Sequence, residues 1–401
     1  MPSGIGPTVA GAGGADVLPA ATDVVIVGAG PTGLALAAEL WRRGIKPVVI
    51  DRQPAGANTS RACVVHARTM EVLAPLGVTE DLLAQGLRVP IFRVRDRDSA
   101  LLTLDFSAIA SAYPFTLMIP QDRVEQTLLA RLEALGGDVV RPCEFVGCDV
   151  GPAHVDVRVC AEAGEQTIRA QWLIACDGMH SRVRGQSGIA FSGGAYQQSF
   201  VLADVDMQWP LGRDEVTLFY SSAGLAVVAP LPEARFRIVA TVDDAPESPT
   251  LDFMQSLLDA RGPTVNSGRI RDMVWSSRFR IHHRVASSLR NGRILLCGDA
   301  AHVHSPAGGQ GMNTGIQDGI SLAETLVSTI ADGDDAGLDI WSGKRHRIAA
   351  NLVRFTDRMT RMATIKSASG KSVRNVAVAL AGRLPAVRAS LARRLAELDA
   401  R

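Results

Sequence analysis

Residues 23–51 constrain the fold more than any other stretch of the sequence. They read as a short apolar strand, a glycine-rich turn, a helix-forming run that stops at Gly44, a second apolar strand and an acidic residue. This is the order and spacing of a dinucleotide-binding unit. In such a unit Gly28 forms the tight turn, Gly30 lets the backbone meet a pyrophosphate, and Gly33 lets the helix pack on the strand. We therefore predict a Rossmann-like α/β domain in which Asp51 binds ribose hydroxyls.

A second glycine-rich loop, residues 299–313, follows another apolar strand at residues 293–297. Asp299 ends that strand, and the loop contains Pro306, Gly309 and Gly311 before a helix-like segment begins near Asn313. Glycines allow close approach of backbone N–H groups to a ligand, and a helix start adds unpaired donors and the positive end of a dipole. Such a loop suits an electron-rich, partly anionic ring system.

A third strand, residues 172–176, runs directly into Asp177 and Gly178. Along the chain, the first glycine turn, the Asp-Gly motif and the second glycine-rich loop resemble the motifs of the FAD-dependent single-component aromatic monooxygenases. This is the family of para-hydroxybenzoate, phenol and aromatic polyketide hydroxylases. The resemblance extends over about residues 23–326. It implies that the first motif binds the ADP half of FAD, the Asp-Gly motif lies between flavin and nicotinamide, and the last motif binds the ribityl chain and the ring.

The resemblance also implies individual roles. Arg61, in Ser-Arg-Ala, would contact the FAD diphosphate and act as the pivot of a moving flavin, and Pro306 would line the oxygen side of the ring. These two are the catalytic candidates, and no general base is assigned. The expected FAD contacts, non-covalent throughout, are Gly28, Ala29, Gly30, Pro31, Thr32, Gly33, Asp51, Arg52, Arg61, Gln121, Phe145, Asp177, Asp299, Pro306, Gly309, Gly311, Met312 and Asn313.

The pattern between the motifs divides the chain. Short alternating strands predict a mainly antiparallel β-sheet, inserted into the FAD domain, whose inner face forms the substrate pocket. Its candidate walls are Phe219, Tyr220, Val228 and Pro230, although core packing is the commoner reason for each such residue. The predicted boundaries are a disordered leader at 1–22, an FAD-binding domain at 23–77, 116–185 and 286–340, the substrate-binding sheet at 78–115 and 186–285, and C-terminal basic helices at 341–401.

Composition narrows the class of protein. The chain has 401 residues, of which 47% are hydrophobic, and no long uncharged apolar run, so we expect no membrane span. The formal charge of +1 argues against nucleic acid as a general partner. The first residues lack the basic start and apolar block of a secretion signal, so we expect a cytoplasmic protein. Neither the six cysteines nor the eight histidines show the spacing of a metal site.

The expected activity follows from the resemblance. The protein would use NADPH or NADH as a transient co-substrate and O2, through a flavin C4a-(hydro)peroxide, to hydroxylate a phenolic and polycyclic substrate of secondary metabolism. Baeyer–Villiger oxygenation of a similar skeleton, reduction of isoprenoid double bonds, and a non-catalytic flavoprotein stay open as alternatives. The sequence leaves open a monomer or a homodimer, and the role of the basic C-terminal helices.

Overall fold

The computed structural model of the chain describes residues 18–56, 62–365 and 367–400. Arg61 and most of the predicted leader therefore lie outside the described residues. Within the described ranges no helix is long and apolar enough to cross a membrane. The same ranges contain no group of three or more His, Cys, Asp or Glu side chains arranged to hold a metal ion.

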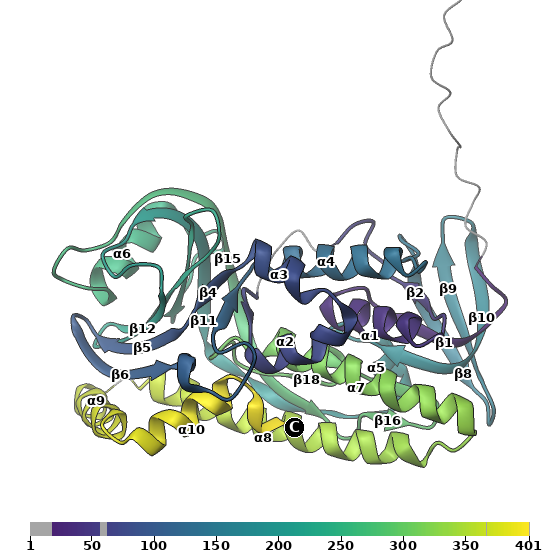
Figure 1. Cartoon of the computed structure of the whole chain (residues 1–401). Helices are drawn as coiled ribbons and strands as arrows, with labels where there is room; N and C mark the ends of the chain where they lie inside the picture. The colour runs from purple at the N-terminus through teal and green to yellow at the C-terminus, as the bar shows by residue number, and fades with distance from the viewer. Residues whose placement is uncertain (1–17, 57–61, 366, 401) are drawn as a thin grey trace, which may run out of the picture.

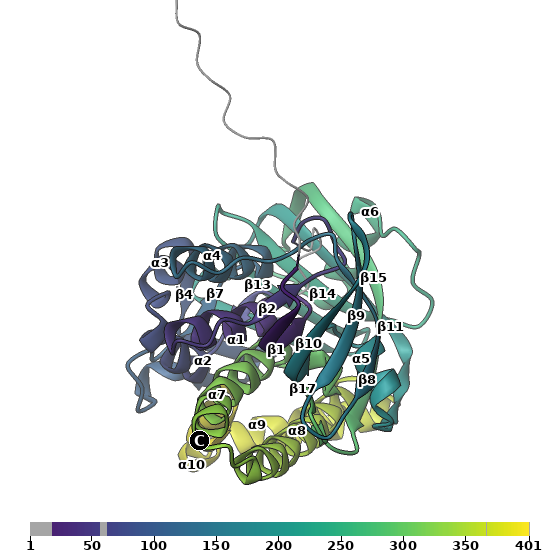
Figure 2. The same ribbon diagram turned by 90° about the vertical axis from the view of Figure 1, so that its right-hand side faces the viewer.

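The first sheet carries the Rossmann-like unit. Its central strands are parallel, in the order β17, β10, β1, β2. A parallel sheet is covered on both faces, which is why these strands are continuous apolar runs in the sequence. Two antiparallel strands extend this sheet, because β9 pairs with β10 and β8 pairs with β9 (Figure 2). The strands are β1 (Ala21–Val27), β2 (Val48–Ile50), β8 (Glu144–Val150), β9 (Val155–Ala161), β10 (Gly164–Ala175), β16 (Arg290–Asn291) and β17 (Ile294–Leu296).

The second sheet is larger and mainly antiparallel, in the order β18, β15, β11, β14, β13, β12, β5, β6. Three short strands form a third sheet, in the order β3, β7, β4. The strands are β3 (Val64–Val65), β4 (Leu87–Val89), β5 (Ile91–Asp96), β6 (Ser99–Asp105), β7 (Thr116–Met118), β11 (Phe191–Gln208), β12 (Glu215–Ser221), β13 (Gly224–Pro230), β14 (Phe236–Val242), β15 (Arg269–Ala286) and β18 (His302–Val303).

Helices cover both sheets (Figure 1). They are α1 (Pro31–Arg42), α2 (Ala67–Leu73), α3 (Thr79–Gln85), α4 (Gln121–Ala134), α5 (Arg182–Ser187), α6 (Leu251–Arg261), α7 (Gly311–Asp332), α8 (Ala336–Ala363), α9 (Ala368–Gly382) and α10 (Pro385–Leu395), with 3-10 turns η1 (Ala74–Leu76), η2 (Phe106–Ala108), η3 (Gly298–Ala300) and η4 (Leu398–Ala400). In Figure 1 the C-terminal helices α8, α9 and α10 run along the lower side of the molecule, below both sheets.

This architecture confirms the predicted fold class: a Rossmann-like α/β domain, a mainly antiparallel second sheet and C-terminal helices. Two helices were not expected. Residues 79–85 form α3 where the sequence predicted only strands, and α6 interrupts the predicted sheet region. The domain boundaries themselves stay predictions.

Candidate active site

The first glycine turn joins β1 to α1 and is shaped by the chain's own packing. A Cβ on Gly28 would lie 2.3 Å from the carbonyl oxygen of Cys176, and one on Gly33 would lie 1.9 Å from that of Gly28. Gly30, in contrast, has nothing within 4 Å of an added Cβ. It is the N-cap of α1, without a side-chain hydrogen bond, and no acidic residue lies in the first turn. The helix start is therefore open to an anion such as a pyrophosphate.

Asp51 is fastened to the same turn. Its Oδ2 accepts a hydrogen bond from the backbone N–H of Ala29 at 2.7 Å, and its Oδ1 accepts from the backbone N–H of Gln53 at 2.8 Å. A carboxylate oxygen can accept more than one hydrogen bond, so both oxygens keep capacity for a ligand hydroxyl. The neighbouring Arg52 is exposed. The ribose contact itself stays a prediction.

Thr32 marks the place where the first and last motifs meet. A Cβ on Gly298 would lie 2.6 Å from Thr32 Oγ1, and one on Gly315 would lie 2.4 Å from the same atom. Asp299 follows in η3 and is exposed. The helix α7 begins as α1 does, with an N-cap, Gln310, that makes no side-chain hydrogen bond and no acid in its first turn. Two uncapped helix starts thus lie near one another, which suits an extended ligand with phosphates at one end and an electron-rich ring at the other.

Asn313 joins the second glycine loop to β3. Its Nδ2 donates to the carbonyl oxygens of Val64 and Gly309, both at 2.8 Å. Its Oδ1 accepts from the backbone N–H of His66 at 2.8 Å. The Asn313 side chain is therefore used within the protein, and the backbone of this turn is what a ligand could reach. Pro306 lies exposed at the start of the same loop, and its carbonyl oxygen accepts from the Gly309 N–H at 2.9 Å.

A buried histidine that the sequence analysis did not select for this role, His66, supports the loop. His66 Nε2 lies 2.7 Å from the carbonyl oxygen of Gly308, and burial lowers the pKa of His66 to about 4. The neutral ring therefore donates its Nε2–H to Gly308 at physiological pH. Burial likewise lowers the pKa of His304 to about 4. No sequence spacing signals the His66 contact, because the two residues lie 242 positions apart.

Asp177 follows β10 and accepts at Oδ2 from the backbone N–H of Arg182 at 2.9 Å. Its Oδ1 is buried without a hydrogen-bond partner among the described residues, and burial raises the pKa of Asp177. Arg184 donates to the carbonyl oxygens of Ala300 and Met179 at 2.7 and 2.8 Å, so it ties the Asp-Gly turn to η3. The Asp-Gly turn and the second glycine-rich loop are thus held together by hydrogen bonds from the Arg184 side chain to backbone carbonyls.

The remaining predicted contacts are spread around this centre. Gly311 and Met312 form the first turn of α7. The side chain of Phe145 is buried in the core beneath β8, which leaves only its backbone for a ligand. Gln121, at the start of α4, accepts from the backbone N–H of Ala62 at 3.3 Å. That bond places Gln121 beside residue 62, the first described position after Arg61.

The second sheet has one face toward α6 and one toward the glycine motifs. Phe219 and Val228 pack in the hydrophobic cluster that includes Met254 of α6, and Pro230 pairs with Phe236 of the same cluster. These three side chains therefore pack on the α6 side, in agreement with the core-packing alternative, and their place in a substrate pocket stays a prediction. The strand alternation was read correctly, but the sequence does not say which face a missed helix covers.

The other face carries Tyr220, which packs with Phe200 and Ile281. On this side Phe92 and Val216 belong to one cluster with Cys63 and Val64, which connects the sheet to β3 and the loop before α7. This is the face that could cover a flavin ring. Of the four proposed wall residues, Tyr220 alone lies on it.

A buried ion pair lies on the same face. Arg237 is 1% exposed and donates through Nε and a terminal nitrogen to both oxygens of Asp204, at 2.7 and 2.8 Å. Trp275 Nε1 also donates to Asp204, at 2.9 Å. Burial raises the pKa of the nearby Cys63 thiol, and the Arg237 charge partly offsets that effect. The sequence analysis missed this pair because both residues occupy ordinary alternating positions of strands.

Comparison with known proteins identifies the family. Residues 21–356 match the family described as FAD binding domain. The chain is 35% identical over 353 residues to a 6-methylpretetramide 4-monooxygenase of Streptomyces rimosus, covering 86% of this chain and 63% of that protein. The chain belongs to the class A FAD-dependent aromatic monooxygenases.

Other members of this family are similar at the same level. Pentachlorophenol 4-monooxygenase of Sphingobium chlorophenolicum is 32% identical, with 84% of this chain and 64% of that protein covered. The chain thus spans less than two thirds of the length of these two relatives. Among solved structures, an anhydrotetracycline hydroxylase from Streptomyces rimosus matches with a TM-score of 0.80 and 31% identity, covering 94% of this chain and 76% of the other.

Membership of the FAD monooxygenase family agrees with the geometry. An aklavinone-11 hydroxylase solved with FAD and aklavinone matches with a TM-score of 0.74 and 25% identity, covering 85% of this chain and 69% of the other. In this chain Gly30 is open at the start of α1, neither α1 nor α7 has a side-chain cap, and close glycine packing at Thr32 brings the two helices together. These residues fit FAD, which is the family's cofactor.

Proposed function

We propose that this protein is an NAD(P)H-dependent FAD monooxygenase that hydroxylates a phenolic, polycyclic substrate. The observation that carries the proposal is the joining of two uncapped helix starts, α1 and α7, through Thr32 in a family of aromatic monooxygenases. Relatives named for pretetramide, anhydrotetracycline and pentachlorophenol substrates support the chemical class.

The chain's residues would divide the work of binding. Backbone N–H groups at Gly30 and the first turn of α1 would bind the diphosphate, and Asp51 would bind the adenosine ribose. The Gly309–Asn313 backbone and the dipole of α7 would stabilise negative charge at the pyrimidine edge of the ring. Bound FAD supplies the electron transfer and the activation of O2. What the protein adds is position, a fixed positive field and exclusion of water.

The nicotinamide co-substrate would bind transiently, since the dinucleotide fold is used by FAD. Asp177, with its buried and unpartnered oxygen, lies between the first and last motifs, where the family resemblance places the nicotinamide path. Arg182 is exposed beside it and pairs with Glu144 at the surface, so it is accessible to a phosphate. Whether NADPH or NADH serves is a matter for measurement.

The substrate would lie between the second sheet and the start of α7. Arg237 and Asp204 supply a buried polar pair on that face, whereas Tyr220 and Phe92 supply apolar surface. An apolar wall with few fixed polar groups is the usual composition of a site for a polycyclic ligand. We assign no general base.

The proposal is tested by spectroscopy and turnover of the purified protein. A yellow protein should oxidise NADPH or NADH faster when a phenolic polycyclic compound is added, and one atom of labelled O2 should appear in the product by mass spectrometry. Oxygen inserted next to a ketone would instead support Baeyer–Villiger chemistry. A protein that binds FAD but shows no stimulated oxidation with any aromatic panel would support a non-catalytic role.

Arg61 gives a more specific test of flavin movement. Replacing Arg61 by Ala should slow substrate-stimulated flavin reduction by roughly tenfold or more, because a guanidinium paired with the diphosphate would guide the ring toward the nicotinamide. Stopped-flow reduction by NADPH with and without substrate measures this. Arg123→Ala is the matched control, because Arg123 lies exposed on α4 and pairs with Glu233 at 3.3 Å. Equal reduction rates in Arg61→Ala and wild type would exclude a guiding role for Arg61.

A further inference from the structure

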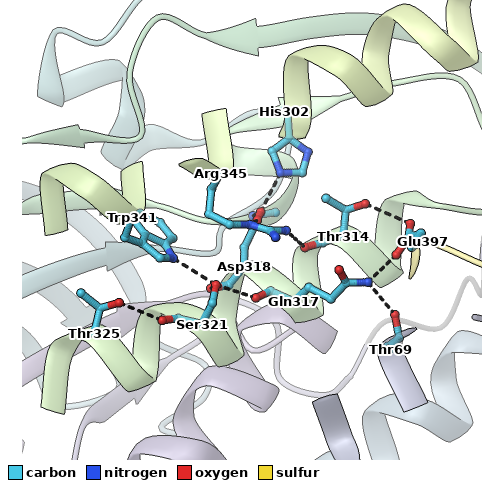
Figure 3. Close-up of polar contacts among 11 residues, drawn as sticks. Thr69, His302, Thr314, Gln317, Asp318, Ser321, Thr325, Trp341, Arg345 and Glu397 are labelled. Atoms are coloured by element: carbon cyan, nitrogen blue, oxygen red, sulfur yellow. Dashed lines mark hydrogen bonds and ion pairs between the residues drawn. The ribbon is translucent and has the colours of Figure 1, made fainter. Parts of the chain in front are cut away.

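A buried carboxyl group from the C-terminal segment contacts the first turns of the flavin helix. Glu397 precedes η4 and is buried, and Thr314 Oγ1 donates to its Oε1 at 3.2 Å. Gln317 Nε2, one turn later on α7, donates to the other oxygen of Glu397 and to Thr69 Oγ1 of α2, the latter at 3.1 Å. Figure 3 shows Thr314 and Gln317 of α7 pointing toward Glu397, and Thr69 of α2 on the other side of the Gln317 amide.

The same turn of α7 is held from the opposite side by a second buried group. Asp318 accepts from His302 Nε2 at 2.6 Å, from the Gly298 backbone N–H at 3.2 Å and from Arg345 of α8. Arg345 also donates to the carbonyl oxygen of Thr314 at 3.2 Å (Figure 3). Thr314 is therefore fixed at its side chain by Glu397 and at its carbonyl by Arg345.

Thr314 directly follows the backbone donors that face the ligand. Its N–H makes the first bond of the helix, to the carbonyl oxygen of Gln310 at 2.9 Å, so the N–H groups before it have no partner within the helix. A shift of Thr314 would move those donors together. We propose that Glu397 is a positioning residue of the flavin site, which holds the first turn of α7 in the orientation that binds the flavin ring.

The surroundings of Glu397 explain why it can position α7 without adding a negative charge near the start of that helix. Burial raises the pKa of Glu397 to about 8, although the bonds from Thr314 and Gln317 and the charge of Arg345 act in the opposite direction. Asp318 adds to the increase. From α2 the segment also receives the backbone N–H of Arg68, bonded to the carbonyl oxygen of Ala396 at 3.2 Å. Near pH 7 the carboxyl group is therefore mostly protonated.

A neutral carboxyl group suits this place. A negative charge near the start of α7 would oppose the positive field that stabilises a reduced, anionic flavin. The sign of the pH effect follows. The folded pKa lies above the unfolded value of 4.5, so the contribution of Glu397 is fully present at low pH and is lost as pH rises through about 8. FAD binding should weaken over the same range.

The inference rests on the proposed placement of the flavin ring at α7, and its test uses FAD binding rather than turnover. The dissociation constant of FAD for the apoprotein would be measured by flavin fluorescence between pH 6.5 and 9. Glu397→Ala should bind FAD about tenfold more weakly at pH 7, because two bonds to α7 are lost. Glu397→Gln should stay within about twofold of wild type, because its amide oxygen can accept from Gln317 Nε2 while its NH2 group donates to the Thr314 hydroxyl, which can act as an acceptor.

The pH profile separates positioning from general stability. Wild-type affinity should decrease above pH 8, whereas Glu397→Gln should show no such decrease. The control is Arg394→Ala, because the guanidinium carbon of Arg394 lies 4.1 Å from the ring centre of Phe355 and helps dock the same segment on α8. Its FAD affinity should equal that of wild type.

Three results would overturn the proposal: unchanged affinity in Glu397→Ala, equal weakening in Arg394→Ala, or parallel pH profiles in wild type and Glu397→Gln. The last comparison holds even if Glu397→Ala does not fold. A wild-type protein that binds no FAD would instead overturn the proposed function, so the two failures are distinguishable. The midpoint potential of bound flavin gives an independent readout. Above pH 8 it should decrease more steeply with pH in wild type than in Glu397→Gln.

Discussion

At the scale of single residues, the site depends on buried polar side chains that bond to the protein rather than to a ligand. Asn313 and His66 fasten the glycine loop to β3, and neither bond has a local sequence signal. The glycines could be read from the sequence because their need for space is local. The bracing residues could not, because their partners become neighbours only after folding.

His66 predicts a defined loss of stability in acid. The folded pKa of about 4 lies below the ordinary value of 6.5, so between these values the unfolded chain binds a proton that the folded protein excludes. Stability should therefore fall as pH falls through this window, by at most roughly 3 kcal/mol from His66 alone. Urea unfolding of wild type and His66→Gln at pH 7 and near pH 4.5 measures the effect. Wild type should lose more stability than the variant, and equal losses would mean that His66 does not titrate in this way.

At the scale of elements, the close contact of α1 with α7 positions the two ends of the flavin site. Gly315 and Gly319 of α7 face Thr32, and Cβ atoms there would lie 2.4 and 2.9 Å from its side-chain and backbone oxygens. Small residues at these positions let the two helices approach. The relative placement of the diphosphate and ring ends of the site is therefore set by helix packing.

Two glycine-to-alanine changes should have opposite effects. In Gly319→Ala the new methyl group would meet the Thr32 carbonyl oxygen at 2.9 Å and Leu36 Cβ at 3.2 Å, so the variant should lose about 1–3 kcal/mol and bind FAD more weakly. Gly343, in the middle of α8, has nothing within 4 Å of an added Cβ, so Gly343→Ala should gain up to about 1 kcal/mol. Chemical denaturation and FAD titration compare them. Destabilisation of the same size in both would contradict the packing argument.

The elements that the sequence predicted well were those with a strong period or a motif. The strand and helix of residues 23–51, the helix after Pro120 and the strands of the second sheet all form as expected. The missed helices have neither a strong hydrophobic period nor a recognisable motif. The helix α3 is a single short run, 79–85. The helix α6 was missed despite its N-cap Thr250, so the strand pattern left open which face of the second sheet a helix covers.

At the scale of the whole molecule, the C-terminal helices connect the two sheets. The helix α8 packs against α7 and β15, whereas α9 packs on β6 and β12. Residues 342–401 are strongly basic, with Asp357, Glu397 and Asp399 as their acids. Yet one of these basic residues docks α9 through bonds to backbone carbonyls, beside the bond from Asn375 to Asp96 at 2.7 Å. Arg374 is 5% exposed and donates to the carbonyl oxygens of Tyr220 at 2.8 Å and Met362 at 3.2 Å.

This arrangement predicts one cooperative unfolding transition in the wild type and its loss in Arg374→Ala. Removing the guanidinium takes away the bonds to Tyr220 and Met362 and leaves the Tyr220 carbonyl with the longer hydrogen bond from Asn375 Nδ2 at 3.3 Å, which costs about 1–3 kcal/mol there and leaves the flavin sheet untouched. Far-ultraviolet ellipticity and flavin release, followed on heating, should coincide in wild type and separate in the variant, with ellipticity changing first. Lys371→Ala is the control, because Lys371 lies on the same helix and donates to the Ser222 carbonyl at the surface. Coincident transitions at an unchanged midpoint in Arg374→Ala would show that α9 does not couple the sheets.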